Sequence, residues 1–535
     1  MIRAWTKRSA RRKYRDMLRG FRKLRASASP NHINKLNSEL TNEEIGIPHS
    51  FFERFIFGSV ADRVEICLRQ LLLAKLASRP LNTALLRSLG RPGLTIRFPL
   101  PKEWIVLIQR SGYKVSERSC RLMLLNFGVQ RLFLALARFL GMLVNMRFKR
   151  PKTENSRYVQ FVDLAFKNLP IPGRQKKYDI VSWYVKWDGA VEELEEIRHT
   201  VRTSTQSNLD GVIARSSGTN IPGFQSMILR LNFLAWGIGA FCVAAFSLLL
   251  ARPWSAILLE DAVQAKAVNL LPSDKLAREY LFSCSGIVKR PLWTYVAELK
   301  GSVISLYYYS AGLPFRDHGV DPHHEIGFES MTWSRILQFS DHQIRFTRAA
   351  VGSDVEVLKV PPIFFSDVNE QLPDVAGTKI ALFDSSPTRI SQSASRIPDS
   401  DYRSVSNGTK FLEDVHHACR INNITLLWKQ KRAHSARHNK QYLKFAKEFA
   451  ERPGVVLVHP DIAAARLIEV CDAVVSIPYT STGLLAKYFD KPSVFHDPAE
   501  SLDKADEANL GIPLVCGRKN LEQWVERQAL SRLDT

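Results

Sequence analysis

The stretch VVSIPYTSTGLLAKYFDKPSVFHDPA, residues 474–499, places a turn and a helical pattern between two apolar runs. The runs AVVSI (473–477) and PSVFH (492–496) are short and mostly apolar, as strands covered on both faces are. Between them, STGLLAKYF (481–489) has the composition of a helix. A strand, a helix and a second strand in this order predict a crossover between parallel strands.

Further apolar runs precede this stretch with helical segments between them: KIALFDSS (379–386), ITLLWK (424–429) and VVLVH (455–459). Such alternation predicts an α/β fold with a doubly wound parallel sheet. Upstream, YDIVSWYV (178–185) and SVISLYYYS (302–310) are typical of strands, and GAVEELEEIRHTV (189–201) is typical of a helix. Helix and strand signals therefore alternate from about residue 150 onward.

Positive charge is concentrated at the start of the chain. Residues 1–150 hold 30 Lys and Arg against 9 Asp and Glu, in a chain of 535 residues with a net charge of +23. Composition changes near residues 148–156, so we expect a basic, mainly helical region over 1–150 and two domains over 151–350 and 351–535. The basic region suits anionic lipid or nucleic acid phosphates, or it is a solvated tail.

A membrane surface is the partner that the first 30 residues favour. Met17, Phe21 and Leu24 share one helical face among the basic residues, as in an interfacial amphipathic helix. An Arg-rich start also resembles a mitochondrial transit peptide, but it contains no apolar segment of the secretory type. Seven cysteines without a C-x-x-C pair argue against a zinc site or a disulfide framework, and a reducing cytosol fits them.

Two apolar segments have the length of membrane helices. Residues 231–250 (LNFLAWGIGAFCVAAFSLLL) are uncharged and form either a spanning helix or a buried core helix. A single crossing would separate the basic region from the C-terminal region, so we favour a buried or monotopic helix. The segment from Leu122 contains Arg131 and Arg138, each costing about 3 kcal/mol at a bilayer centre, and we expect it to lie on the surface.

Polar groups follow the predicted strands of the C-terminal domain, where a parallel sheet binds its ligands. The helix that begins in the Pro-Tyr-Thr-Ser-Thr turn offers free amides and a positive dipole end to an anion, although a Ser or Thr there is commonly only a helix cap. The cations of WKQKR follow a neighbouring strand and suit a phosphate leaving group. The candidate donor-binding residues are Ser385, Lys429, Lys431, Arg432, His459, Pro460, Ser476, Thr480, Ser481 and Thr482.

Several familiar sites are absent from the sequence. It contains neither G-x-x-x-x-G-K-[ST] nor a G-x-G-x-x-G after a strand, which argues against an ATPase and a classical dinucleotide enzyme. DPHHEIG (321–327) has imidazoles and carboxylates, but their spacing matches no metal motif. We therefore expect neither a metal nor a cofactor.

The residues Pro478-Tyr479-Thr480-Ser481 and their surroundings resemble the bacterial surface-polysaccharide biosynthesis proteins named for a Pro-Phe-Thr-Ser motif, with Tyr in place of Phe. RPLWTYVAELKG (290–301), YYYSAG and WKQKR also look like this family, and the resemblance covers roughly residues 160–515. The family is similar in layout to GT-B glycosyltransferases, in which two Rossmann-like domains face a cleft. The resemblance thus implies a GT-B-like fold and a nucleotide-sugar donor in the C-terminal domain.

The motif also looks like that of Kdo and sialic acid transferases, in which a His-Pro pair and a Ser/Thr turn hold CMP. Carried over by position, His459 and Pro460 would have the first role, and Thr480 and Ser481 the second. We expect transfer of a sugar to a glycan or lipid-linked acceptor by a cytoplasmic enzyme at the inner face of the membrane. Carboxylates after the YYYSAG segment are the candidate catalytic bases: Asp317, Glu325 and Glu329.

Two other functions remain open from the sequence. A non-catalytic scaffold in a polysaccharide assembly complex would keep the fold and bind the nucleotide sugar without transferring it. A nucleic-acid-binding protein would use the basic region for affinity, but the sequence shows no nucleic-acid motif and the charge lies away from the strand ends. We therefore expect no nucleic acid partner.

Overall fold

A computed structural model of the chain describes residues 117–144, 159–162, 220–224, 226–251, 254–283, 290–308, 333–351, 355–362, 371–387, 404–431, 438–502 and 507–530. The strand expected at 178–185 and the helix expected at 189–201 lie outside these residues, as do residues 1–116 of the basic region.

The first half contains a parallel sheet of five strands. Their spatial order follows the chain: β1 (Val159–Val162), β2 (Glu279–Ser283), β3 (Val303–Tyr307), β4 (Arg335–Gln338) and β5 (Glu356–Lys359). The strand expected at 302–310 is β3. Because β5 pairs with β4, this sheet continues beyond residue 350, where the sequence placed the start of the second domain.

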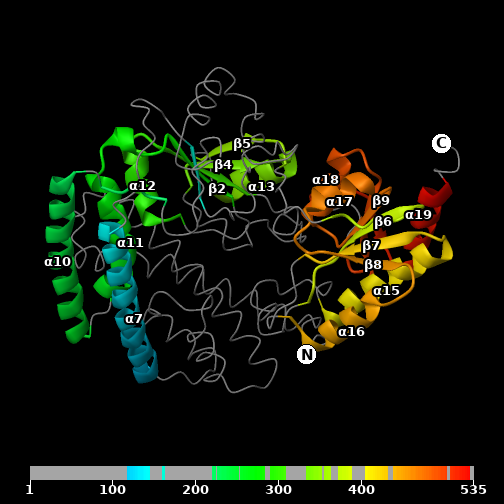
Figure 1. Cartoon of the computed structure of the whole chain (residues 1–535), viewed down its shortest axis with the longest axis horizontal. Coiled ribbons are helices and arrows are strands. Elements are labelled where there is room, and N and C mark those ends of the chain that lie inside the picture. The colour runs from blue at the N-terminus through cyan, green and yellow to red at the C-terminus, as the bar shows by residue number, and fades with distance from the viewer. Residues whose placement is uncertain are drawn as a thin grey trace.

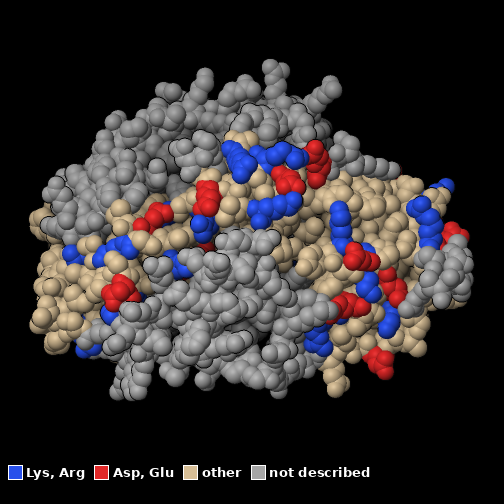
Figure 2. Space-filling view, turned by 90° about the horizontal axis from the view of Figure 1, so that it is seen from above, with Lys and Arg blue, Asp and Glu red and all other residues tan. Residues whose placement is uncertain are grey.

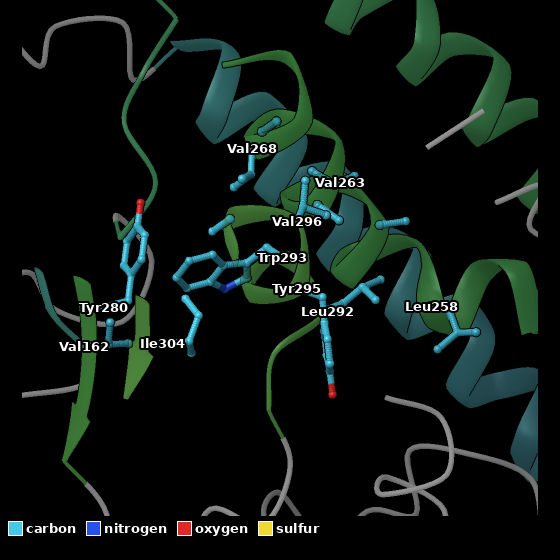
Figure 3. Close-up of a cluster of buried hydrophobic side chains, with 14 of the residues drawn as sticks. Val162, Leu258, Val263, Val268, Tyr280, Leu292, Trp293, Tyr295, Val296 and Ile304 are labelled. Carbon is cyan, nitrogen blue, oxygen red and sulfur yellow. The ribbon is translucent and has the colours of Figure 1, made fainter. Parts of the chain in front are cut away.

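Helices accompany this sheet at one end of the molecule (Figure 1). They are α7 (Glu117–Val144), α10 (Met227–Leu249), α11 (Trp254–Leu270), the short η2 (Ser273–Lys275) and α12 (Leu292–Leu299). Helix α13 (Asp341–Val351) lies apart from them, between this sheet and the second half (Figure 1). Figure 3 shows α12 between the strands and α11, with Trp293 pointing toward Tyr280 and Ile304. The Trp293 and Tyr280 rings meet edge to face at 4.9 Å between centroids, so α12 joins the helices to the sheet.

The RPLWTYVAELKG segment has a structural role in this core. The guanidinium group of Arg290 is buried, donates from Nε to Thr294 Oγ1 at 2.9 Å and from Nη2 to Glu298 Oε2 at 2.6 Å, and lies over the Tyr295 ring. A charge can be buried when it is paired and hydrogen-bonded in this way. The segment therefore fixes the start of α12.

Of the two forms expected for 231–250, a buried or a monotopic helix, the buried core helix is not what the structure has. Of the residues of α10, only Phe233, Gly237 and Ala244 are buried, and they face α7 and α11. Most of its other apolar side chains are exposed, among them Ile238 (60%) and Leu249 (84%). Helix α10 is apolar on all sides, but only one stripe of it packs against the neighbouring helices. The rest of α10 lies outside the core.

The second half contains a six-stranded parallel sheet. Its strands are β6 (Lys379–Phe383), β7 (Thr425–Lys429), β8 (Val455–Val458), β9 (Ala473–Ser476), β10 (Ser493–Asp497) and β11 (Leu514–Cys516). The spatial order is β11-β10-β9-β6-β7-β8. Every strand expected between 379 and 496 is present, and β11 was not expected.

Helices cover both faces of this second sheet. One face packs against α15 (Val405–Ile421), α16 (Lys440–Ala450) and α19 (Arg518–Leu530), and the other against α17 (Ala464–Val470) and α18 (Ser481–Tyr488). Alternate residues of β6 feed the two cores: Ile380 and Leu382 belong to one, Ala381 and Phe383 to the other. The α/β class with two parallel sheets is therefore confirmed.

The two halves contact each other through α13 and the short η7 (Glu507–Asn509). His342 Nδ1 lies 3.1 Å from Glu507 Oε2, and Arg345 also pairs with this carboxylate. On the face shown in Figure 2, the Lys and Arg side chains of the described residues lie among Asp and Glu rather than in one basic patch.

Candidate functional site

The strand order of the second sheet locates its ligand-binding edge. The chain builds β6, β7 and β8 outward in one direction, then returns to place β9, β10 and β11 on the other side of β6. The order therefore reverses between β6 and β9. In open parallel sheets, ligands bind beyond the carboxyl ends of the strands at such a point.

The register aligns the candidate residues along this edge. Phe383 of β6 is level with Ser476 of β9 on one side and with Lys429 of β7 on the other. Lys429 is in turn level with Val458, the residue before His459. Ser476, Lys429 and the His-Pro pair, which belong to three separate strand ends in the sequence, thus lie at one level of the sheet.

The turn after β9 has an unusual backbone. Tyr479 has a φ of 60°, a left-handed conformation that costs a non-glycine residue free energy. Its ring is 2% exposed and packs near Phe495, with centroids 6.4 Å apart. The buried ring explains how Tyr can stand in place of Phe in the motif, and its packing holds the strained turn.

Helix α18 begins directly after this turn with a chain of hydroxyl groups. Thr480 is the N-cap residue, but its side chain accepts no bond from the first-turn amides and instead donates to the Ile477 carbonyl oxygen at 2.8 Å. Thr482 Oγ1 lies 2.9 Å from Ser476 Oγ and 3.1 Å from Thr480 Oγ1. Capping alone therefore does not account for these hydroxyls.

The WKQKR segment differs from the expected group of three cations past a strand. Lys429 is the last residue of β7 and is buried, and its Nζ donates to the carbonyl oxygens of Pro460 at 3.1 Å and Gln430 at 3.3 Å. Lys431 is exposed, and Arg432 lies outside the described residues. Lys429 thus ties the end of β7 to the turn that carries the His-Pro pair.

His459 is exposed beside that turn, with Pro460 half-buried behind it. The backbone N–H of Asp461 donates to His459 Nδ1 at 3.3 Å. In the neutral imidazole this leaves the proton on Nε2, which can donate to a ligand.

The remaining candidates occupy different positions. Ser385 is half-buried two residues beyond β6, and Ser481 is the first residue of α18. The expected catalytic carboxylates Asp317, Glu325 and Glu329 lie outside the described residues, so their roles stay predictions.

One further residue at this edge belongs to the polar groups that follow the strands in the sequence, although it is not among the candidate donor-binding residues named from it. Asp384 follows β6, is 5% exposed and accepts a hydrogen bond from the Tyr442 hydroxyl of α16. Burial raises the pKa of this carboxyl to about 6, although the Tyr442 and Trp428 side chains and the charge of Lys429 oppose the rise. Strongly shifted carboxyls gather at functional sites, and this one lies at the reversal of strand order.

A second buried carboxylate, Asp414 of α15, lies away from this edge. It contacts His496 Nε2 at 3.2 Å, Lys410 Nζ at 3.0 Å and Arg518 Nε at 2.7 Å. Burial opposes its charge, but these three partners outweigh burial and lower its pKa to about 2. Because it joins α15, β10 and α19, we assign it a structural role.

Within the described ranges, no group of three His, Cys, Asp or Glu side chains is placed to hold a metal ion. Three of the carboxylates that the sequence singled out lie outside those ranges, so the expectation of metal-independent chemistry stays a prediction.

The family model of the polysaccharide biosynthesis PFTS motif proteins matches residues 238–525, which include the whole second sheet. No curated protein matches the chain.

Solved structures show distant similarity. UDP-GlcNAc 2-epimerase from Methanocaldococcus jannaschii is 8% identical with a TM-score of 0.30, over 50% of this chain and 74% of that one. The pneumococcal O-GlcNAc transferase GtfA, solved with UDP and GlcNAc, is 8% identical with a TM-score of 0.30, over 51% and 53%. Spinosyn forosaminyltransferase SpnP is 11% identical with a TM-score of 0.31, over 60% and 79%. Likeness this distant says nothing of this chain's activity.

Proposed function

We propose that this chain, which belongs to the polysaccharide biosynthesis PFTS motif family, is a glycosyltransferase that builds a bacterial surface polysaccharide from a nucleotide-sugar donor. The observation that carries the proposal is the start of α18 at the reversal of strand order between β6 and β9. Its hydroxyls and first-turn amides converge where a parallel sheet binds a nucleotide.

In this proposal the donor phosphates lie at the first turn of α18. The positive end of the helix dipole and the hydroxyl of Thr482 would stabilise the negative charge that develops on the departing nucleotide, while Thr480 keeps its hydroxyl proton on the Ile477 carbonyl oxygen. Ser476 keeps Thr482 in place through their 2.9 Å contact. His459 Nε2 and the exposed Lys431 would contact the same phosphates or the base.

Asp384 would accept hydrogen bonds from hydroxyl groups of the donor. A buried carboxylate beside Tyr442 is preorganised for this, since it needs no further desolvation when the ligand enters. The base that deprotonates the acceptor would come from the first half, with Asp317, Glu325 and Glu329 as candidates. No metal takes part in this scheme.

The acceptor would be a glycan or a lipid-linked sugar, and the enzyme would work at the inner face of the cytoplasmic membrane. The excess of 30 basic over 9 acidic residues in 1–150 supports attraction to anionic lipid.

The first experiment is a thermal shift titration of the purified chain with CMP, UDP, GDP and ADP. We expect one nucleotide to stabilise the protein selectively. Replacing Thr482 with Val keeps the shape but removes the hydroxyl, and should weaken that nucleotide about tenfold or more, since a hydrogen bond to a charged group contributes about 1.5 to 3 kcal/mol.

Thr425→Val is the matched control, because Thr425 is half-buried at the opposite, amino end of β7. Equal loss of binding in both variants, or no loss in Thr482→Val, would place the nucleotide elsewhere. Selective binding without transfer to any acceptor extract would favour the scaffold function. Steep salt-dependent binding to duplex DNA or RNA, with no nucleotide shift, would favour a nucleic-acid-binding protein.

A further inference from the structure

The first half of the molecule presents a continuous apolar surface built by α7 and α10, which we call the α7–α10 face. In α10 it includes Met227, Ile228, Leu231, Leu234, Ile238, Val243, Phe246 and Leu249, and in α7 Phe133, Leu134, Leu136, Leu140 and Val144, each exposed by more than a third. Monomeric soluble proteins rarely leave an apolar surface of this extent in water. Something must cover it.

The two helices are packed together by their other sides. The ring of Phe139 in α7 lies against Phe233 at 4.8 Å, and no side chain beyond hydrogen would fit at Gly237, because a Cβ there would lie 2.2 Å from that ring. The face is thus one surface fixed by close packing rather than two separate helices.

The arginines that interrupt the apolar sequence of α7 do not interrupt this face. Arg131 and Arg138 both pair with Glu260 of α11, the latter at 3.1 Å between Nη2 and Oε1. We expected these two charges to keep α7 out of a bilayer, but each is at most one-third exposed and pairs with Glu260 on the protein side. The outer surface of α7 beyond Arg131 is therefore apolar.

The charge at the start of α10 is also engaged with the protein. The guanidinium group of Arg230 donates to the Phe224 carbonyl oxygen from Nη2 at 2.9 Å and from Nε at 3.2 Å. From Leu231 to Leu249 the helix carries no charged residue. An uncharged outer surface along about 28 Å of helix matches lipid better than the mixed surface of a protein partner.

The connection between α10 and α11 resolves the topological conflict that a single crossing raises. Only four residues separate Leu249 from Trp254, and the two helices pack together, so they form a helical hairpin. Because α11 runs back along α10, the segments before α10 and after α11 lie on the same side of a membrane. Helix α11 is mostly buried between α10 and α12, which keeps lipid from surrounding α10.

We infer that the α7–α10 face lies in one leaflet of a lipid bilayer as a monotopic membrane-contact surface. In the sequence, Arg147, Lys149, Arg150 and Lys152 follow the end of α7, and basic residues of this kind suit anionic headgroups. This inference gives the proposed membrane association a surface, and it does not depend on sugar transfer.

The test uses Cys242, which is exposed on α10, as a reporter of insertion. The full-length protein is labelled with a water-soluble maleimide, with and without vesicles of phosphatidylcholine and phosphatidylglycerol, and labelling is read peptide by peptide by mass spectrometry. We expect vesicles to slow Cys242 labelling at least about fivefold, even at about 0.5 M salt, which screens exposed charges. Cys516, partly exposed in the second half, is the internal reference and should react equally in both samples.

A variant pair completes the test. Replacing both Ile238 and Phe246 with Glu places two charges on the face and should reduce vesicle co-flotation at least about tenfold. Replacing Leu299 and Ile421 with Glu, which are 53% and 54% exposed elsewhere, should leave it unchanged. Retained flotation of the first variant, unprotected Cys242, or release of the protein by salt alone would overturn the inference. Such results would mean that another protein segment or a second copy covers the face.

Discussion

Replacing Asp384 with Asn should make the protein more stable and less active. The pKa of this buried carboxyl is raised from 3.8 to about 6, roughly two units, and each unit corresponds to about 1.4 kcal/mol. Because the native state holds the proton more tightly than the unfolded chain, native stability falls as the pH rises from about 4 to 6. Above that range the ionised carboxyl destabilises the native state by about 3 kcal/mol.

The Asp384→Asn substitution would keep the size of the side chain and an oxygen that accepts from the Tyr442 hydroxyl, but the new amide would not ionise. We therefore expect urea unfolding at pH 8 to show the variant about 2 to 3 kcal/mol more stable than the wild type. The difference should shrink below about 1 kcal/mol at pH 4, where the wild-type carboxyl is protonated in the folded state. Nucleotide-dependent stabilisation should be weakened at both pH values.

Asp374→Asn is the control for losing one negative charge, since Asp374 is exposed; it should change stability by less than about 0.5 kcal/mol. The reasoning fails if Asp384→Asn is less stable than the wild type at pH 8, or if the stability difference does not vary with pH. Unchanged nucleotide binding would remove Asp384 from the proposed donor site while leaving the electrostatic argument intact.

Two further predictions concern the packing that holds each half together. Gly237→Ala should destabilise the protein by about 1 to 3 kcal/mol, because the added methyl group meets the Phe139 ring. Gly239→Ala, with no atom within 4 Å of the new methyl group, should stabilise α10 by up to about 1 kcal/mol. Thermal unfolding of the two variants distinguishes them. Asp414→Asn should lower the free energy of unfolding by about 2 kcal/mol at pH 7. Because the pKa of Asp414 in the folded protein is lowered to about 2, the wild type should lose this stabilisation as the pH falls from about 4 to 2. A variant as stable as the wild type at pH 7 would contradict the role of the Arg518 contact.

The second sheet could be predicted from sequence because its strands are continuous apolar runs. AVVSI and ITLLWK contain mostly apolar residues, which suit a strand in a sheet that is covered by helices on both faces. The segments between the strands are long enough for the helices of parallel crossovers. Strand β11 was missed because it has only three residues, Leu514–Cys516, too few to show a pattern. Strand β1 was missed for a similar reason, as its four residues lie between segments of mixed polarity.

The candidate site was predictable only in its position. The sequence shows which polar groups follow each strand. It does not show whether these groups face a ligand or the protein, because that depends on partners far away in the chain. Lys429 is expected to meet a phosphate, and the sequence does not show that its Nζ donates to the Pro460 carbonyl oxygen. Burial raises the pKa of Asp384, against the opposing hydrogen bond from Tyr442, which lies 58 residues later in the chain. Arg131 and Arg138 likewise turn inward because Glu260 lies on a helix that is distant in sequence.

Two energetically costly features flank the reversal of strand order. Tyr479 holds a left-handed backbone at the end of β9, and Asp384 is a carboxyl at the end of β6 whose burial disfavours its ionised form. A glycine would relieve the first, and an uncharged side chain the second. Left-handed non-glycine residues also occur elsewhere in this half, at Asn423, Asp490, Glu500 and Leu510, so backbone strain alone does not distinguish the turn after β9. Burial raises the pKa of Asp384 at the reversal of strand order, where a parallel sheet binds its ligands. Strongly shifted carboxyls gather at functional sites, so Asp384 supports the proposal that the start of α18 binds the donor.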